Sequence, residues 1–151
     1  MGAGFVDGGG SLIDTTYVDD AVAAHLCALD AVAPAAPCSG RAYFISSGDP
    51  RPVREVVNAI LAAGGLPPET RSVPLPVAVV AGAVAEGVWR LLRRTDDPPM
   101  TRFFARQLAT AHWFDITAAR RDLGYAPTVG LDEGFRRLAA SLGTRPGALP
   151  A

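Results

Sequence analysis

A short apolar run, a pair of aspartates and a longer amphipathic run follow one another between Ser11 and Ala33. The first run, 12–18, is rich in β-branched residues and follows several glycines, which predicts a strand. The second predicts a helix of about four turns with one buried apolar stripe, because its apolar residues recur at spacings of three and four. Asp19 and Asp20 stand between the two runs, where their carboxylates are expected to cap the helix start. The expected stripe consists of Val22, Leu26, Leu29 and Val32 or Ala33.

Composition limits the function classes that remain open. The chain has 151 residues, about half of them apolar, and a net charge of -1, which favours one folded domain and gives no electrostatic reason to bind nucleic acid. Cys27 and Cys38 show no metal-ligand spacing, so neither a metal site nor a disulfide is predicted. No basic segment followed by an apolar run opens the sequence, so a signal peptide is not supported and a cytoplasmic location is expected.

All fourteen basic residues are arginine. A chain without lysine cannot supply a Schiff-base lysine, a Walker A loop or a Tyr-x-x-x-Lys pair. Chemistry that requires a lysine is therefore excluded within these 151 residues.

Residues 1–10 are rich in glycine and in this respect are similar to a dinucleotide-binding loop. Such a loop works only between a strand and a helix, whose N-terminus receives the pyrophosphate. More glycines follow here instead of a helix, so a flexible loop leading to Leu12 is predicted, with no cofactor-binding residue.

Alternating short strands and helices are predicted further along the chain. Residues 41–46 and 71–75 read as strands, and residues 53–61 carry a complete apolar helical stripe that ends at Gly64. The apolar run 77–92 is too short and too charged to span a membrane. It is expected to form a buried or lid-like helix, with a helix lying on a membrane surface as the alternative.

The last third of the chain carries its own start and stop signals. Thr101 is expected to cap a short helix, residues 111–115 alternate like a strand, and Asp115 is expected to cap another helix. A final helix starts near Leu131, and residues 143–151 are expected to form a loose tail.

Four segments in the same order resemble the C-terminal plan of extended short-chain dehydrogenases/reductases, the NAD-dependent epimerase/dehydratase superfamily. They are D-T-T-Y-V-D-D-A-V-A-A-H at 14–25, Y-F-I-S-S-G at 43–48, a strand and helix ending in L-G-Y-A-P at 114–127, and L-D-E-G-F at 131–135. The first is most similar to the 3β-hydroxysteroid dehydrogenase-like branch.

The resemblance implies an α/β fold class, namely the C-terminal part of an extended Rossmann-type dehydrogenase, mostly helical with a few short strands. Residues 1–142 would be the substrate-binding portion, with the last Rossmann-sheet elements at 10–46 and the nucleotide-binding half absent. It also implies that the full-length protein uses NAD or NADP, that none binds to this chain alone, and that the chain by itself is inactive. The partner would then be the missing Rossmann half or another protomer.

Two departures from the family pattern bear on the substrate. Nucleotide-sugar epimerases of the superfamily carry an arginine for the substrate diphosphate where Ile13 stands here, and the apolar run 77–92 replaces a later arginine-rich loop. An isoleucine cannot neutralise a diphosphate, whereas an apolar insert can cover an apolar ligand. An apolar small molecule, such as a steroid, terpenoid or long-chain keto compound, is therefore favoured over a nucleotide sugar, which stays open as an alternative.

Five aromatic residues are candidates for lining an apolar substrate pocket: Tyr17, Trp89, Phe103, Phe104 and Trp113. Ordinary core packing is the competing interpretation for each of them. Peripheral membrane contact through 77–92 is a further possibility that the resemblance implies. A free-standing, non-catalytic binding or interaction module is the alternative from a different function class.

Overall fold

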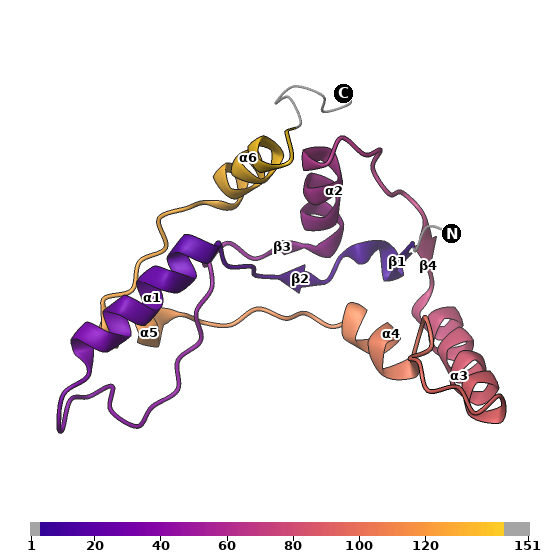
Figure 1. Ribbon diagram of the computed structural model, residues 1–151, viewed down its shortest axis with the longest axis horizontal. Helices are drawn as coiled ribbons and strands as arrows, with labels where there is room; N and C mark the ends of the chain where they lie inside the picture. Colours follow the sequence, from indigo (N-terminus) through magenta and orange to yellow (C-terminus); the bar gives the residue numbers. More distant parts are fainter. Residues whose placement is uncertain (1–3, 144–151) are drawn as a thin grey trace.

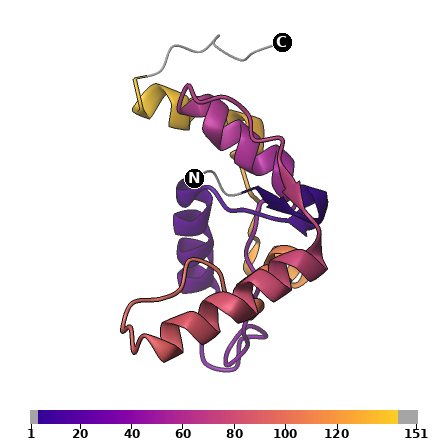
Figure 2. The same cartoon turned by 90° about the vertical axis from the view of Figure 1, so that its right-hand side faces the viewer.

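The computed structural model describes residues 4–143, so the expected tail lies outside the described residues except for Gly143. Its elements spread along one long axis, with α3 and α4 at one end, α1 and α5 at the other, and α2 and α6 side by side above the middle (Figure 1). In the end-on view, α3 lies across the front (Figure 2). The helices are α1 Val18–Ala31, α2 Val53–Ala63, α3 Leu75–Leu91, α4 Arg102–Leu108, α5 Thr117–Leu123 and α6 Leu131–Ser141.

The described strands are only two residues long. β1 (Phe5–Val6) pairs in parallel with β4 (Ser72–Val73), and β2 (Leu12–Ile13) pairs antiparallel with β3 (Arg51–Pro52). A 3-10 turn, η1 (Asp7–Gly9), joins β1 to β2, so residues 5–9 form a strand and a turn where a loop was predicted.

Three strand predictions were too long or wrong. The predicted strand 12–18 ends at Ile13, because the chain enters α1 at Val18. Residues 41–46 form no strand, and residues 111–115 make only one parallel bridge, from His112 to Ile13. Strand assignment requires a hydrogen-bonded neighbour, and the described residues supply none for most of these segments.

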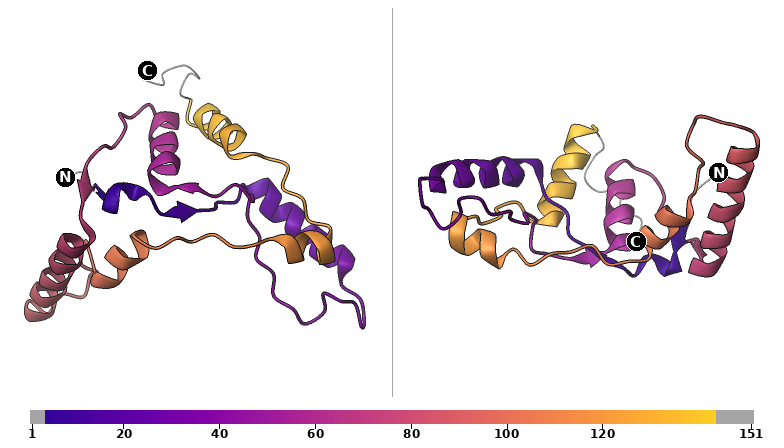
Figure 3. Two further views of the ribbon diagram at one scale, coloured as in Figure 1. Left: turned by 180° about the vertical axis from the view of Figure 1, so that it is seen from behind. Right: turned by 90° about the horizontal axis from the view of Figure 1, so that it is seen from below.

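Two small apolar cores sit at opposite ends of the molecule (Figure 3). One lies between α1 and α5 and contains Ala24, Ile116, Ala119 and Tyr125; the other lies between β1, α3 and α4 and contains Val6, Ala78 and Ala105. The accessible surface is 10067 Å², whereas a compact monomer of 15.7 kDa exposes about 7,300 Å². The elements therefore do not close around a single core.

The apolar stripe predicted for α1 has the right period but is not buried. Val22, Leu26 and Leu29 are 54%, 56% and 71% exposed, and the buried side of α1 carries Asp20 and Ala24 instead. The predicted core face of this helix thus has no partner among the described residues.

The predicted capping role of Asp19 and Asp20 was also wrong. Tyr17 is the N-cap residue of α1, and no side chain caps this helix. Asp20 is fully buried and accepts hydrogen bonds from the Thr128 hydroxyl (2.8 Å), the Thr128 N–H (2.8 Å) and the Val129 N–H (3.0 Å). The Asp20 carboxylate therefore holds the segment between α5 and α6 against the start of α1. Asp19 instead forms an exposed ion pair with Arg137.

Other helix boundaries follow local signals in the sequence. The Thr101 hydroxyl accepts a hydrogen bond from the Phe104 N–H at 3.0 Å and caps α4. The Asp115 carboxylate accepts from the Thr117 N–H at 2.8 Å, one residue ahead of the N-cap residue Ile116. Gly124 ends α5 in the left-handed conformation that glycine tolerates best.

The predicted helix 77–92 is α3, and it crosses α4 at very short range. A Cβ atom at Gly82 would lie 2.7 Å from the backbone N of Arg102, so only glycine permits this approach. Glu86, one turn later, accepts hydrogen bonds from the Arg102 N–H and guanidinium at 2.8 Å each. Within residues 4–143, none of the helices combines the length and hydropathy needed to cross a bilayer.

We expect Gly82→Ala to destabilise the chain by roughly 1–3 kcal/mol, because the added methyl group forces α3 away from α4. The matched control is Gly87→Ala in the same helix, where nothing lies within 4 Å of the new Cβ and helix propensity gains up to about 1 kcal/mol. Thermal unfolding followed by circular dichroism measures both. Equal melting temperatures for the two variants would rule out the close crossing.

We expect Asp20→Asn to cost about 2 kcal/mol, because the amide nitrogen cannot accept a hydrogen bond and leaves a buried N–H unpaired. Urea unfolding compares it with the exposed control Asp19→Asn, which should unfold at the wild-type midpoint.

Low pH should remove the stability that the Asp20 carboxylate contributes. Burial raises the pKa of Asp20, but the hydrogen bonds from Thr128 and Val129 outweigh burial and hold it below its usual value. A lowered folded-state pKa contributes stability above the unfolded pKa and loses it as the pH falls through the folded one. The advantage of wild type over Asp20→Asn should therefore shrink below about pH 4. An unchanged difference down to low pH would contradict the role of the carboxylate.

Candidate functional site

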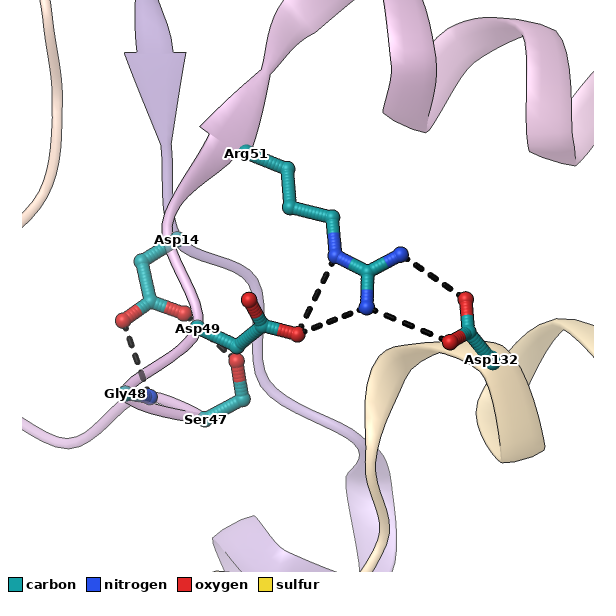
Figure 4. Close-up of polar contacts among 6 residues, drawn as sticks. All are labelled: Asp14, Ser47, Gly48, Asp49, Arg51 and Asp132. Atoms are coloured by element: carbon teal, nitrogen blue, oxygen red, sulfur yellow. Dashed lines mark hydrogen bonds and ion pairs between the residues drawn. The ribbon is translucent and has the colours of Figure 1, made fainter.

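A polar cluster lies where the segment 41–46 turns toward β3 (Figure 4). The Asp14 carboxylate, just after β2, accepts hydrogen bonds from the Ser46 hydroxyl (2.7 Å), the Ser47 hydroxyl (2.6 Å) and the Gly48 N–H (2.9 Å). These contacts hold the turn 46–48 against the end of β2. The cluster is therefore a junction between two segments rather than an open binding site.

Arg51 on β3 completes this cluster. Its guanidinium lies between Asp49 (2.8 Å) and Asp132 at the start of α6 (2.8 Å). The hydrogen bonds that Arg51 donates to Asp132 and Asp49 raise the pKa of Arg51, and Arg51 in turn lowers the pKa of Asp132. An arginine held by two carboxylates is not free to neutralise a ligand anion.

The α3–α4 apolar surface is the larger exposed feature. Residues of α3 that do not face α4 recur at spacings of three and four, as on one side of a helix. Phe103 and Phe104 of α4, the helix that packs against α3, are 72% and 48% exposed. The exposed α3 residues are Val77, Val80, Val84, Val88 and Leu91, between 41% and 83% exposed.

The five predicted pocket residues lie on different parts of the chain. Trp89, Phe103 and Phe104 belong to the α3–α4 unit, where the Trp89 indole N–H donates to Asp96 at 3.4 Å and lies under the Arg94 guanidinium. Tyr17 instead lies beneath the Arg137 guanidinium of α6, 5.3 Å from it. Trp113, half exposed, follows α4 on the way to α5.

A shallow hollow of about 430 Å³ lies elsewhere, along α2 from Arg54 to Ala62 and beside Leu66 and Pro68. None of the five predicted residues lines it.

A stacked aromatic pair was missed by the sequence analysis. The rings of Phe44 and Phe114 lie 3.9 Å apart and parallel, although both residues are about half exposed. The signal was present in the alternation of the segment 41–46, which places Tyr43 and Ile45 on one side and Phe44 on the other.

The glycine-rich segment 4–10 does not have the geometry of a dinucleotide-binding loop. The glycine-rich segment continues into β2 rather than into a helix, so no helix N-terminus faces it. A Cβ atom at Gly9 would lie 2.9 Å from the Phe5 ring and 3.0 Å from Arg54, so this glycine serves packing within the chain. Among residues 4–143, no group of acidic, histidine or cysteine side chains is placed to hold a metal ion.

No family model matches the sequence. The chain is 50% identical over 136 residues to a 2-alkyl-3-oxoalkanoate reductase of Stenotrophomonas maltophilia, a match that covers 90% of this chain and 41% of the reductase. It is 33% identical over 135 residues to a 3β-hydroxysteroid dehydrogenase/decarboxylase of Arabidopsis thaliana, covering 85% of this chain and 24% of that protein. The chain thus spans well under half the length of the curated relatives it matches.

The fold is also similar to that of a solved structure. A UDP-glucuronic acid 4-epimerase of Bacillus cereus, solved with UDP-glucuronic acid and NAD, superposes with a TM-score of 0.55 at 18% identity. The match covers 93% of this chain and 34% of the epimerase, so it shows a shared fold and no more. The chain belongs to the extended short-chain dehydrogenase/reductase superfamily, in its 3β-hydroxysteroid dehydrogenase-like branch, and corresponds to the C-terminal part of such proteins.

Proposed function

We propose that this chain is the substrate-binding part of an NAD(P)-dependent oxidoreductase that interconverts a hydroxyl and a keto group on an apolar substrate. The observation that carries the proposal is the α3–α4 apolar surface, which exposes valine, leucine and phenylalanine side chains without a partner among the described residues. Exposed apolar patches of this kind mark places where a ligand or another surface binds.

The substrate class follows from the chain's relatives and from its own chemistry. Half of the matched residues are identical to those of the 2-alkyl-3-oxoalkanoate reductase, whose name describes a keto acid with an alkyl branch. An alkyl chain on that scaffold would be covered by the face of α3. We therefore propose a long-chain 3-oxo acid, rather than a steroid, as the substrate.

A nucleotide-sugar substrate is disfavoured by the residue opposite Ile13. Arg51 pairs with Ile13 across β2 and β3, and it is the cation nearest in register to the position where epimerases use an arginine. Asp49 and Asp132 already neutralise the Arg51 guanidinium, so Arg51 is not available to bind a diphosphate.

The chain's contribution is to bind the substrate, orient it and exclude water. With no lysine and no Tyr-x-x-x-Lys pair, it holds none of the acid/base groups expected of this superfamily. We propose that NAD or NADP and these groups come with a nucleotide-binding half.

The direct test is a fusion in which the part of the Stenotrophomonas reductase ahead of the matched segment precedes this chain. We expect the fusion to oxidise NADPH in the presence of a long-chain 2-alkyl-3-oxoalkanoate. Val84→Asp should raise the KM for the long-chain substrate about tenfold, because a carboxylate disrupts the apolar cover.

Ala83→Asp is the matched control, since Ala83 is also exposed on α3 but lies beside the apolar face. Equal KM values for all three fusions would show that this face does not cover the substrate. Release from lipid vesicles by Val84→Asp at unchanged KM would assign the surface to a membrane instead.

A further inference from the structure

The hollow along α2 shares no residue with the α3–α4 apolar surface. The α2 residues that line it recur at spacings of three and four, whereas the buried Val56 and Ala63 lie on another side of the helix. Its volume of about 430 Å³ falls within the range of roughly 300–1,000 Å³ that is usual for small-molecule sites. The lining residues of α2 are Arg54, Glu55, Asn58, Ala59 and Ala62.

The other wall of the hollow is built by a sharp turn at the end of α2. Leu66 and Pro68 belong to this wall. The Leu66 N–H donates to the Leu61 carbonyl at 2.8 Å. The Gly65 N–H donates to the Ala62 carbonyl at 3.0 Å, with Gly65 in the left-handed conformation. This pair of hydrogen bonds is the Schellman motif, which fixes the direction of the chain beyond the helix.

Asn58 holds the same wall against α2. Its side-chain amide donates to the Glu69 carbonyl at 3.3 Å and accepts from the Glu69 N–H at 2.9 Å. Pro67 and Pro68 restrict the backbone between the turn and this contact, because their rings fix φ. The hollow is therefore formed without a ligand, so that binding requires little ordering of the protein.

Two opposite charges on the hollow are unpaired. Arg54 and Glu55 are exposed, and neither forms an ion pair within residues 4–143. As neighbours in a helix they point in different directions and do not pair with each other. Glu69 is not available to Arg54, because Arg71 already binds it at 2.8 Å. The rest of the lining is apolar apart from Asn58, whose amide is used by Glu69.

We infer that this hollow binds a small zwitterion with an apolar side chain, of the class of the apolar amino acids. Arg54 receives the carboxylate and Glu55 the ammonium group, while the side chain lies against the alanines of α2 and Leu66. A ligand with only a negative charge would be repelled by Glu55, and one with only a positive charge by Arg54. Because both charges are exposed to water, we expect an affinity in the millimolar range.

The probes are L-leucine and two analogues that each keep one of its charges, isocaproate and isoamylamine. The isotope-labelled chain is titrated with each probe at low ionic strength, and amide chemical shifts are followed by NMR. We expect L-leucine to shift the amides of residues 54–69 saturably, and each analogue to bind at least tenfold more weakly. If the chain alone aggregates, the fusion described above is titrated instead, without nicotinamide.

Arg54→Gln and Glu55→Gln should each weaken the binding of L-leucine at least tenfold. Glu55→Gln should also strengthen the binding of isocaproate, and Arg54→Gln that of isoamylamine, which damage to the fold would not do. Ala62→Leu should weaken all three probes, because it fills the hollow without changing a charge. Arg106→Gln is the matched control, since Arg106 is also exposed and without an ion pair within residues 4–143 but lies on α4.

The inference is overturned if no saturable shift occurs at residues 54–69 up to about 50 mM L-leucine. Equal binding of L-leucine and isocaproate would also overturn it, in favour of a site for a simple carboxylate. Shifts that survive Arg54→Gln and Glu55→Gln together would place the probe elsewhere and have the same consequence. The test does not depend on the proposed function: a fusion that binds L-leucine but does not oxidise NADPH would count against that function alone.

Discussion

This protein carries more large apolar side chains than its described helices and strands bury. α1 and α3 each carry a regular apolar stripe, and in both helices the buried positions are small residues or an acid: Asp20 and Ala24 in α1, Ala78 and Gly82 in α3. Most of the longer apolar side chains of the two helices are exposed. Burying one such side chain contributes about 1.5–3 kcal/mol, so two uncovered stripes are a strong drive toward association or ligand binding.

Hydrogen bonds between segments that are distant in the sequence hold the described elements together, because the apolar cores are small. Asp20 binds the backbone at Thr128 and Val129, more than a hundred residues away in sequence. Tyr125, almost fully buried, donates its hydroxyl to the Ser46 carbonyl at 3.0 Å, and burial raises its pKa. These contacts position α1, α5 and the segment 41–46 around one small core.

Local features of the molecule could be predicted from the sequence, and long-range ones could not. Helix α2, the Thr101 cap and the end of α5 at Gly124 depend on residues within a turn of each boundary, and the structure shows all three. The role of Asp20 depends on Thr128, which no short window of sequence connects to it. The pattern of 41–46 was that of a strand, but a strand exists only with a neighbour, and the described residues provide none.

The candidate site divides in the same way. The apolar character of α3 could be predicted from its composition and from the spacing of its apolar residues. The resemblance to the family rested on the order of several motifs, and the relatives confirm it. The positions of Tyr17, Trp89 and Trp113 depend on tertiary structure: Tyr17 precedes α1, Trp89 lies on α3 and Trp113 follows α4.

We propose that this chain binds substrate and depends on another half of the enzyme for hydride transfer. The decisive assay mixes the purified chain alone with NADPH or NADH and a 2-alkyl-3-oxoalkanoate. We expect no oxidation of the nicotinamide above the rate without protein; sustained, substrate-dependent turnover by this chain alone would show that it needs no other half.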